Sequence, residues 1–384
     1  MADKSPRQFF YAVAALIGMI VGAGTFGLPY IAAQSGFWLS FFYLSLLGLA
    51  ALLVHLIYGE IVLRTDGQHR LVGYAEKYLG KRAKVAATSI LLFEYYGALL
   101  VYLILGGSFL KSIFGFFWLG APVWFWPLVF FLLGIGAIIG GLKSFERSEF
   151  LMSGLLLLAV AALAVKGWPQ VSLNNFSATV WPKFFLPYGV FLFALAGSAA
   201  IPEIRHILRG QERKISQAIF WGTVIPIVLY FLFIFVVVGI SGPATTESAF
   251  EGLAPYLGRE IIYFGAVFGL LAVFTSFLVL GWSLKNVFDK DYKIKKTWGY
   301  FLVFSVPLLA YFSGLRDFIF VVGLVGAVAS GLDGLLTVLI FLRARKTGDR
   351  RPEYRLPLAR PMAGFLMIVF ILGLIYQFIY LSVK

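Results

Sequence analysis

The stretch Leu16–Tyr30, which reads LIGMIVGAGTFGLPY, is apolar enough to cross a bilayer but carries four glycines and a proline. Backbone N–H and C=O groups left free in hydrocarbon are costly unless protein, a cavity or a ligand satisfies them. We therefore expect a helix break at Gly22-Ala23-Gly24. Thr25 is a suitable N-cap for a second half-helix, and Pro29 falls in its first turn, where a missing N–H matters least. The half-helix ends would offer amides and carbonyls, which together suit a zwitterion.

The composition excludes a soluble protein. Hydrophobic residues make up 60% and charged residues 13% of the 384 residues, whereas a soluble domain holds roughly 25% charged residues. The chain is therefore predicted to be an all-α polytopic membrane protein that forms one integral unit. It contains no cysteine, which excludes disulfides, thiolate chemistry and cysteine-bound metal.

The loops predict how the chain crosses the membrane. Twenty-six of the 32 lysines and arginines lie in loops on the side of the N-terminus, which places that end in the cytoplasm and the C-terminus outside. The net charge of +14 then reflects topology and contact with anionic lipid in a plasma (inner) membrane, and no nucleic-acid partner is expected. The eleven predicted spans are 8–34, 37–63, 85–110, 121–141, 147–167, 184–208, 215–240, 260–286, 297–313, 318–342 and 361–382.

An internal repeat relates the two halves of the chain. Gly24-Thr25-Phe26-Gly27-Leu28-Pro29 recurs in the sixth span as Gly197-Ser198-Ala199-Ala200-Ile201-Pro202. The first span runs outward and the sixth inward, so the halves are inverted, and paired breaks indicate a transporter with its site at the midplane. The predicted units are a transporter core at 1–342 with repeats at about 8–167 and 184–342, a basic cytoplasmic linker at 343–360 and a peripheral eleventh helix at 361–384.

The sixth span is expected to unwind at Ala196-Gly197-Ser198, with Ser198 as the cap of the following half-helix. Small residues at this point could instead serve tight helix packing alone. Phe193 precedes the break on its outer side and is a candidate lid over a bound ligand. The alternative for Phe193 is an aromatic side chain that faces lipid or the core.

A group of oxygen atoms in two spans suits a monovalent cation. Thr275 and Ser276 place two hydroxyls on one helix face with the carbonyl of Ala272, one turn earlier. The carbonyls of Gly18 and Val21, freed at the first break, would complete five ligands for Na+. The alternative is ordinary bonding of the two hydroxyls to carbonyls of their own helix.

Few ionisable residues lie within the spans, and such residues are functional candidates by default. Glu94 and Asp333 fall in the inner halves of the third and tenth spans, where they could be protonated or paired across an inner vestibule. His55 is either a proton relay or a core histidine that is satisfied by Glu60 or by a backbone carbonyl.

Charged residues at the inner ends of the spans are candidate gates. Arg7 or Lys4, ahead of the first span, could pair with Asp289 at the inner end of the eighth span and close an inner gate. A solvated surface pair is the alternative. Glu203, near the inner end of the sixth span, is a further candidate.

No enzyme motif is present. The chain has no G-x-S-x-G, no H-E-x-x-H and no phosphate-binding loop, and its three histidines are far apart in the sequence. We therefore expect neither enzymatic activity nor an organic cofactor.

The two break motifs resemble a known family. IGMIVGAGTFGLPY resembles the first helix of the amino acid–polyamine–organocation (APC) superfamily. GSAAIPEI resembles the sixth helix of its amino acid/auxin permease and aromatic amino acid permease branches, and Tyr58-Gly59-Glu60 is similar to their Tyr-x-Glu. The resemblance covers about 8–342 and implies secondary transport of amino acids by a LeuT-type fold, in which two inverted five-helix repeats have broken helices 1 and 6. An eleventh helix is added here.

The resemblance also implies a site. Amides of Gly22, Ala23 and Gly24 would meet the substrate carboxylate, and carbonyls of Val21 and of 193–196 would meet the ammonium. The five oxygen ligands match the commonest sodium site of the family, with Phe193 at its aromatic lid. A second sodium site of some relatives is expected to be absent, because its first-helix asparagine is Thr25 here and its sixth-helix hydroxyl is Ala194.

We therefore expect a sodium symporter that imports a neutral aliphatic or aromatic L-amino acid by alternating access, as a monomer or an oligomer. Proton coupling through Glu94, Asp333 or His55 is an alternative, and a membrane-bound amino acid sensor without flux is another. The expected substrate-binding residues are Val21, Gly22, Ala23, Gly24, Thr25, Tyr96, Gly97, Phe193, Ala194, Ala196, Gly197 and Ser198. The expected Na+ ligands are Gly18, Val21, Ala272, Thr275 and Ser276, and the gating or coupling candidates are Arg7, Asp289, Glu94, Glu203, Asp333 and His55.

Overall fold

The computed structural model describes residues 5–67, 69–140, 154, 158–177, 179–357 and 359–383, and within these ranges it contains no strand. The α-helices are α1 (Ser5–Ile20), α2 (Gly24–Ser35), α3 (Phe37–Arg64), α4 (Leu71–Leu79), α5 (Lys81–Phe114), α6 (Phe125–Ile139), α8 (Leu186–Ala194), α9 (Ile201–Ile207), α10 (Ile215–Ser241), α11 (Ala254–Leu257), α12 (Glu260–Asn286), α13 (Lys296–Phe312), α14 (Phe318–Val325), α15 (Gly331–Thr347) and α16 (Ala359–Val383). Short 3₁₀ turns cover Gly115–Phe117, Trp168–Gln170, Leu173–Phe176, Trp181–Lys183, Ser198–Ala200, Glu212–Lys214, Gly242–Ala244 and Glu251–Leu253, and π-helical turns cover Val287–Asp291 and Gly326–Ser330.

The helices confirm a polytopic membrane architecture. Seven described helical segments are long and apolar enough to cross a bilayer, and the bent pair α1/α2 makes an eighth. The shorter apolar helices α6 and α13 stand where the fourth and ninth spans were predicted. Most of the predicted fifth span, 147–167, lies outside the described residues, although 158–167 is helical.

The first break lies where the glycines predicted it. α1 ends at Ile20, α2 begins at Gly24, and the two half-helices meet at an angle of 55°. The prediction that Thr25 is the N-cap was wrong, because Ala23 occupies that position and the first turn is closed by backbone bonds instead. Pro29 therefore lies inside α2, beyond its first turn.

The second break is also confirmed. α8 ends at Ala194, and a 3₁₀ turn precedes α9, which has Pro202 near its start. Ser198 was wrongly predicted as a cap. No side chain caps this turn, and the hydroxyl of Ser198 instead donates to Asp333 at 3.0 Å.

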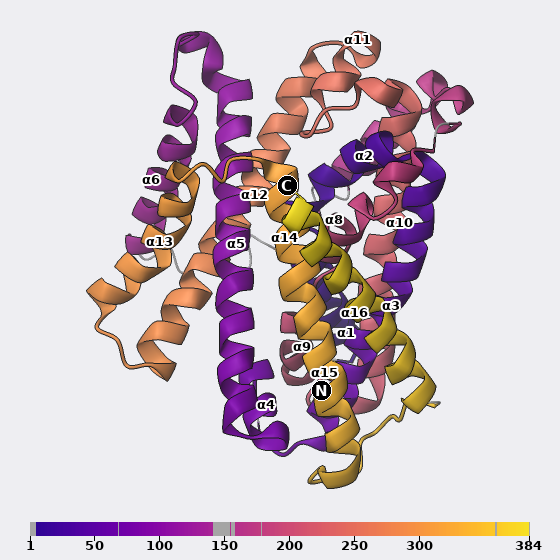
Figure 1. Ribbon diagram of the computed structural model, residues 1–384, viewed down its shortest axis with the longest axis vertical. Coiled ribbons are helices and arrows are strands. Elements are labelled where there is room, and N and C mark those ends of the chain that lie inside the picture. The colour runs from indigo at the N-terminus through magenta and orange to yellow at the C-terminus, as the bar shows by residue number, and fades with distance from the viewer. Residues whose placement is uncertain are drawn as a thin grey trace.

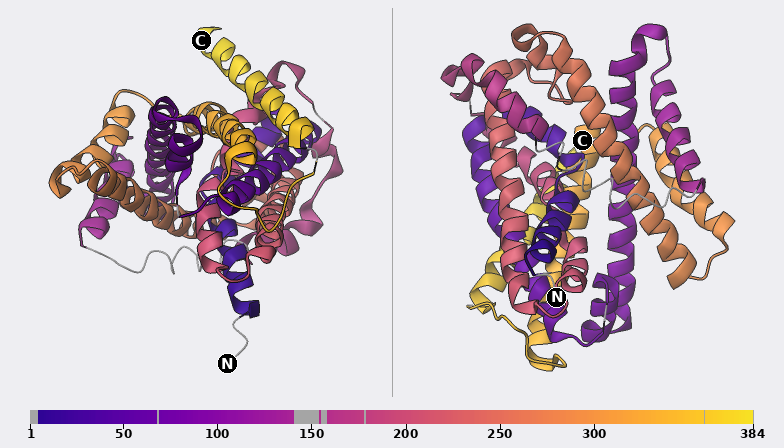
Figure 2. Two further views of the ribbon diagram at one scale, coloured as in Figure 1. Left: turned by 90° about the horizontal axis from the view of Figure 1, so that it is seen from below. Right: turned by 180° about the vertical axis from the view of Figure 1, so that it is seen from behind.

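Figures 1 and 2 show how the elements are arranged. The two broken pairs, α1/α2 and α8/α9, lie at the centre and pack against α3 and α10, while α5, α6, α12 and α13 stand together on the other side. α4, the start of α1 and the linker after α15 lie at one end, and α11 lies at the opposite end (Figure 1). This separation agrees with the alternation of loops from which the topology was predicted.

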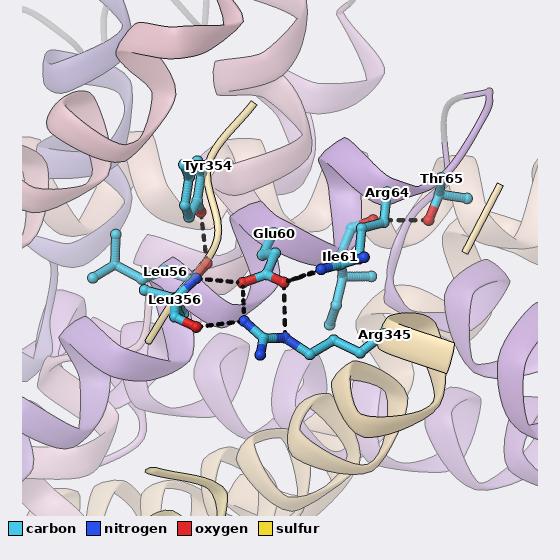
Figure 3. Close-up of polar contacts among 8 residues, drawn as sticks. All are labelled: Leu56, Glu60, Ile61, Arg64, Thr65, Arg345, Tyr354 and Leu356. Carbon is cyan, nitrogen blue, oxygen red and sulfur yellow. Dashed lines mark hydrogen bonds and ion pairs between the residues drawn. The ribbon is translucent and has the colours of Figure 1, made fainter. Parts of the chain in front are cut away.

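The linker between α15 and α16 crosses the C-terminal end of α3, on the side predicted to be cytoplasmic, and is bonded to it (Figure 3). α15 runs to Thr347, five residues beyond the predicted end of the tenth span, so Arg345 is helical. Tyr354 donates to the carbonyl of Leu56 at 2.6 Å. Gly59 makes this crossing possible, because a Cβ at that position would lie 2.2 Å from the Tyr354 hydroxyl.

Glu60 is the centre of this contact and is fully buried. Its carboxylate accepts from Arg64 Nε at 2.8 Å, from Arg345 Nε and Nη2 at 2.9 Å each, and from the backbone N–H of Leu356 at 2.8 Å. Farther along the linker, Asp349 pairs with Lys77 of α4, and this hydrogen bond lowers the pKa of the Asp349 carboxyl. We call the bonded segment 348–357 the inner strap.

Neutralising Glu60 should destabilise the protein strongly. In Glu60→Gln the carboxylate that pairs two arginines is lost from a buried position, and we expect a loss of about 3–5 kcal/mol in the free energy of unfolding. Thermal unfolding of the purified protein, followed by tryptophan fluorescence, measures the change.

Glu76→Gln is the matched control, because Glu76 forms an exposed pair with Lys84 at 2.8 Å. Such surface pairs contribute roughly 0–1 kcal/mol. Equal stabilities for the two variants would contradict a central role for Glu60.

Candidate functional site

The two helix breaks touch each other. A Cβ at Gly24, the first residue of α2, would lie 2.7 Å from Cα of Ala194, the last residue of α8. A Cβ at Gly197 would lie 2.5 Å from the side chain of Ile20, at the end of α1. Only glycine permits this approach, so the glycines that interrupt the helices also bring the interruptions together.

The breaks leave main-chain groups without backbone partners. Within the described ranges, the amides of Gly22 and Ala23 and the carbonyls of Leu195 and Ala196 form no backbone hydrogen bond. There is space beside the first break, because the nearest atom to a Cβ built at Gly22 is the hydroxyl oxygen of Tyr102, at 4.0 Å. Amides, carbonyls and a phenolic hydroxyl thus meet in one place.

Two tyrosines at the breaks were not predicted. Tyr230 of α10 is fully buried, and its hydroxyl oxygen lies 2.8 Å from the carbonyl oxygen of Ile20 and 2.9 Å from that of Ala194. Tyr102 reaches the first break from α5. One feature of the sequence could have pointed to Tyr230: it carries the single hydroxyl in the otherwise apolar stretch Ile227–Phe235.

The sequence-predicted residues of the third span lie beside other helices. The Tyr96 hydroxyl donates to the carbonyl of Leu302 on α13 at 3.1 Å. A Cβ at Gly97 would lie 2.2 Å from the side chain of Val325 on α14, so this glycine serves close helix packing. Phe193, by contrast, is half-buried against Gly24 at the breaks.

The predicted sodium ligands come from helices with different neighbours. α12, with Ala272, Thr275 and Ser276, packs chiefly along α5, whereas α1, which contains Gly18 and ends just before Val21, packs chiefly along α10 and α9. The Thr275 hydroxyl donates within its own helix, to the carbonyls of Leu271 at 3.1 Å and Ala272 at 3.0 Å. This is the back-bonding alternative. The sodium site stays a prediction.

Two acidic residues gather at the second break. Asp333 of α15 accepts the hydrogen bond of Ser198, and Glu94 of α5 is close enough for the two carboxylates to repel. The π-helical turn Gly326–Ser330 precedes Asp333 and packs on α8. The hydrogen-bond partner of Asp333 is therefore a hydroxyl of the second break.

The remaining candidates have local partners. The buried His55 lies 3.0 Å from the Thr223 hydroxyl, so it is a satisfied core histidine whose partner is neither Glu60 nor a carbonyl. Asp289 pairs with Lys285 of the preceding helical turn at 3.0 Å, not with the exposed Arg7. Lys4 lies outside the described residues, and Glu203 is exposed on α9.

An apolar pocket adjoins the first break. Thr25, whose side chain is fully buried, is one of the residues that line it. A site of this kind has an aromatic and aliphatic lining with a few polar groups near one end. The aromatic side chains of the lining are Phe26, Phe233, Phe250, Phe264 and Phe268.

Comparison with known proteins gives consistent results. The family model described as the tryptophan/tyrosine permease family matches residues 5–377. The chain is 25% identical over 360 residues to tyrosine-specific transport system 1 of Haemophilus influenzae, covering 87% of this chain and 88% of that protein. It is 21% identical over 361 residues to glutamine transporter 2 of Aliivibrio fischeri, covering 89% and 91%.

Solved structures share the fold. MhsT in complex with L-phenylalanine superposes with a TM-score of 0.63 at 17% identity, covering 98% of each chain. Inward-facing Mhp1 superposes with a TM-score of 0.64 at 15% identity, covering 97% of this chain and 90% of Mhp1. The expected LeuT-type fold is confirmed, and the expectation of no enzyme is confirmed by relatives that are transporters.

Adding a methyl group at Gly24 should disturb the contact between the breaks. In Gly24→Ala the new Cβ meets backbone and must separate α2 from α8, which we expect to cost about 1–3 kcal/mol of stability. Thermal unfolding measures the loss. Gly136→Ala in α6, where a Cβ meets nothing within 4 Å, is the control; equal effects would contradict the packing argument.

Proposed function

The chain belongs to the tryptophan/tyrosine permease family, and from this premise we propose that it imports a neutral L-amino acid across the membrane by alternating access. The observation that carries the proposal is the meeting of two helix breaks with unpaired amides and carbonyls. A membrane helix keeps such groups only where they line a cavity or hold a ligand. An amino acid needs both kinds of group, one for each of its charges.

The proposed contacts follow the signs of the partial charges. The substrate carboxylate would accept hydrogen bonds from the amides of Gly22, Ala23 and Gly24, with the Tyr102 hydroxyl beside them. The ammonium would donate to the carbonyls of Leu195 and Ala196, which form no backbone hydrogen bond at the second break. Each end of the zwitterion then replaces its hydration with fixed main-chain dipoles.

We propose an aromatic side chain as the preferred cargo. The apolar pocket has room for no more than about one water molecule, so its five phenylalanines would have to move apart before they could pack their ring edges and faces on a cargo beside Thr25. Two curated relatives are described as tyrosine-specific, and the glutamine transporter shows that the specificity of such relatives varies. Aliphatic side chains are the second choice.

Sodium symport is the proposed coupling. The ligands would be the carbonyls of Gly18, Val21 and Ala272 and the hydroxyls of Thr275 and Ser276, all oxygens, as a hard cation prefers. Thr275 would have to turn its lone pairs toward the ion while it keeps its bond within α12.

Proton coupling is the second candidate, and one observation favours it. Asp333 and Glu94 stand near each other, and Ser198 of the second break donates to Asp333. Adjacent carboxylates repel unless one of them carries a proton. Proton release from this pair would change the hydrogen bond at the break, which links protonation to the region that holds the cargo.

Transport is tested in proteoliposomes. Radiolabelled L-tyrosine or L-tryptophan should accumulate inside, and unlabelled aromatic amino acids should compete better than charged ones. Gly22→Ala should reduce uptake at least about tenfold without lowering the melting temperature, because the methyl group enters open space between amide and cargo. Saturable binding without uptake would identify a sensor instead.

The coupling ion is tested with imposed gradients. An inward Na+ gradient should drive uptake, and Thr275→Ala together with Ser276→Ala should abolish the sodium effect while Asp333→Asn retains it. Uptake driven by an acidic exterior in choline, and lost in Asp333→Asn or Glu94→Gln, would replace sodium with protons.

A further inference from the structure

Tyr230 holds the two broken helices together at the point where both end. α1 ends at Ile20 and α8 ends at Ala194, and the carbonyl oxygens of these terminal residues lie 2.8 and 2.9 Å from the single hydroxyl of Tyr230. In unbroken helices these carbonyls would accept from the amides four residues later. The breaks remove those donors, and a third helix supplies the replacement.

The electrostatics of this contact require a positive partner. The C-terminal end of a helix carries roughly half a negative charge. The C-terminal ends of α1 and α8 both point at the hydroxyl oxygen of Tyr230, so these two ends repel each other. Bulk water does not reach this hydroxyl, because Tyr230 is fully buried. A bound cation, the ammonium group of a ligand or a proton on an oxygen can each relieve the repulsion, and here the proton of the Tyr230 hydroxyl is in that position.

One hydroxyl proton cannot satisfy two carbonyls at once. The contact is therefore shared, and the carbonyls remain able to interact with further positive charge. Thr25 is also fully buried, and its hydroxyl interacts with that of Tyr230. Two carbonyls and a hydroxyl thus surround the Tyr230 oxygen, which is a set of oxygen ligands that would suit a monovalent cation if the phenolic oxygen were absent.

We propose that the Tyr230 hydroxyl takes the place of a bound cation between the two breaks and fixes α1 to α8 as a built-in clamp. In this role Tyr230 is a positioning residue, and its effect on uptake rests on the proposed transport function. The clamp accounts for the expected absence of a second sodium site at Thr25 and Ala194, because a side chain of the protein fills that place. The clamp also fixes the position of the two breaks relative to each other before the cargo binds.

Removing the hydroxyl should create a cation site. In Tyr230→Phe the ends of α1 and α8 lose their shared donor, so the melting temperature in choline chloride should fall below that of the wild type. Sodium chloride at equal ionic strength should restore part of the loss, beyond any effect of sodium on the wild type. Uptake should fall about tenfold in kcat/KM.

The matched control is Tyr188→Phe. Tyr188 is also a buried tyrosine, but its hydroxyl donates to the carbonyl of Val369 on α16, away from the breaks. This control should show neither the additional sodium response nor the loss of uptake. A Tyr230→Phe protein that behaves like Tyr188→Phe in both measurements overturns the proposal.

A second pair of variants decides the question if Tyr230→Phe does not fold. Tyr230→Lys places an ammonium group at a similar reach, and Tyr230→Met is a chain of similar length without a donor. The lysine variant should be more stable than the methionine variant and insensitive to sodium; no advantage for lysine overturns the clamp. If the wild type carries no amino acid, the proposed function fails, while the melting temperatures still decide on the clamp.

Discussion

The structure depends on how main-chain polar groups are satisfied inside a membrane. Within a helix the backbone N–H and C=O groups pair with each other. Each break leaves some of these groups unpaired at a depth where no bulk water is present. At the first break backbone bonds close one turn of α2, and at the second a 3₁₀ turn does the same for α9. The hydroxyl of Tyr230 in α10 is shared between the carbonyls of Ile20 and Ala194. The amides and carbonyls left over form the candidate site.

Glycine makes this arrangement possible in two ways. It interrupts the helices, and it allows backbones to approach within distances that any side chain would prevent, as Gly24 against Ala194 shows. The same device recurs where Gly326 of the π-helical turn packs on the backbone of Gly189 in α8, which fixes the helix that carries Asp333 beside the second break. The glycines of the sequence therefore account both for the close packing of the helices and for the unpaired backbone groups of the candidate site.

The sequence allowed some of this to be predicted and not the rest, for physical reasons. Apolar spans with paired Gly and Pro motifs identify two broken helices and hence the fold, because hydrocarbon penalises every alternative. The caps at Thr25 and Ser198 were wrong, because local propensity competes with backbone bonds and with a distant acceptor such as Asp333. Tyr230 lies 210 residues from Ile20, and Arg345 lies 285 residues from Glu60, so no local spacing rule could predict these two contacts.

The inner strap couples parts of the chain that the sequence separates. Since Glu60 bonds both Arg345 and the backbone of Leu356, α3, α15 and the linker that leads to α16 are held together at one buried carboxylate. A tilt of α3 relative to α15 would have to break the bonds of Glu60 or move the linker and α16 as well. If α3 and α15 change their relative tilt during transport, the position of α16 in the bilayer is therefore expected to change as well.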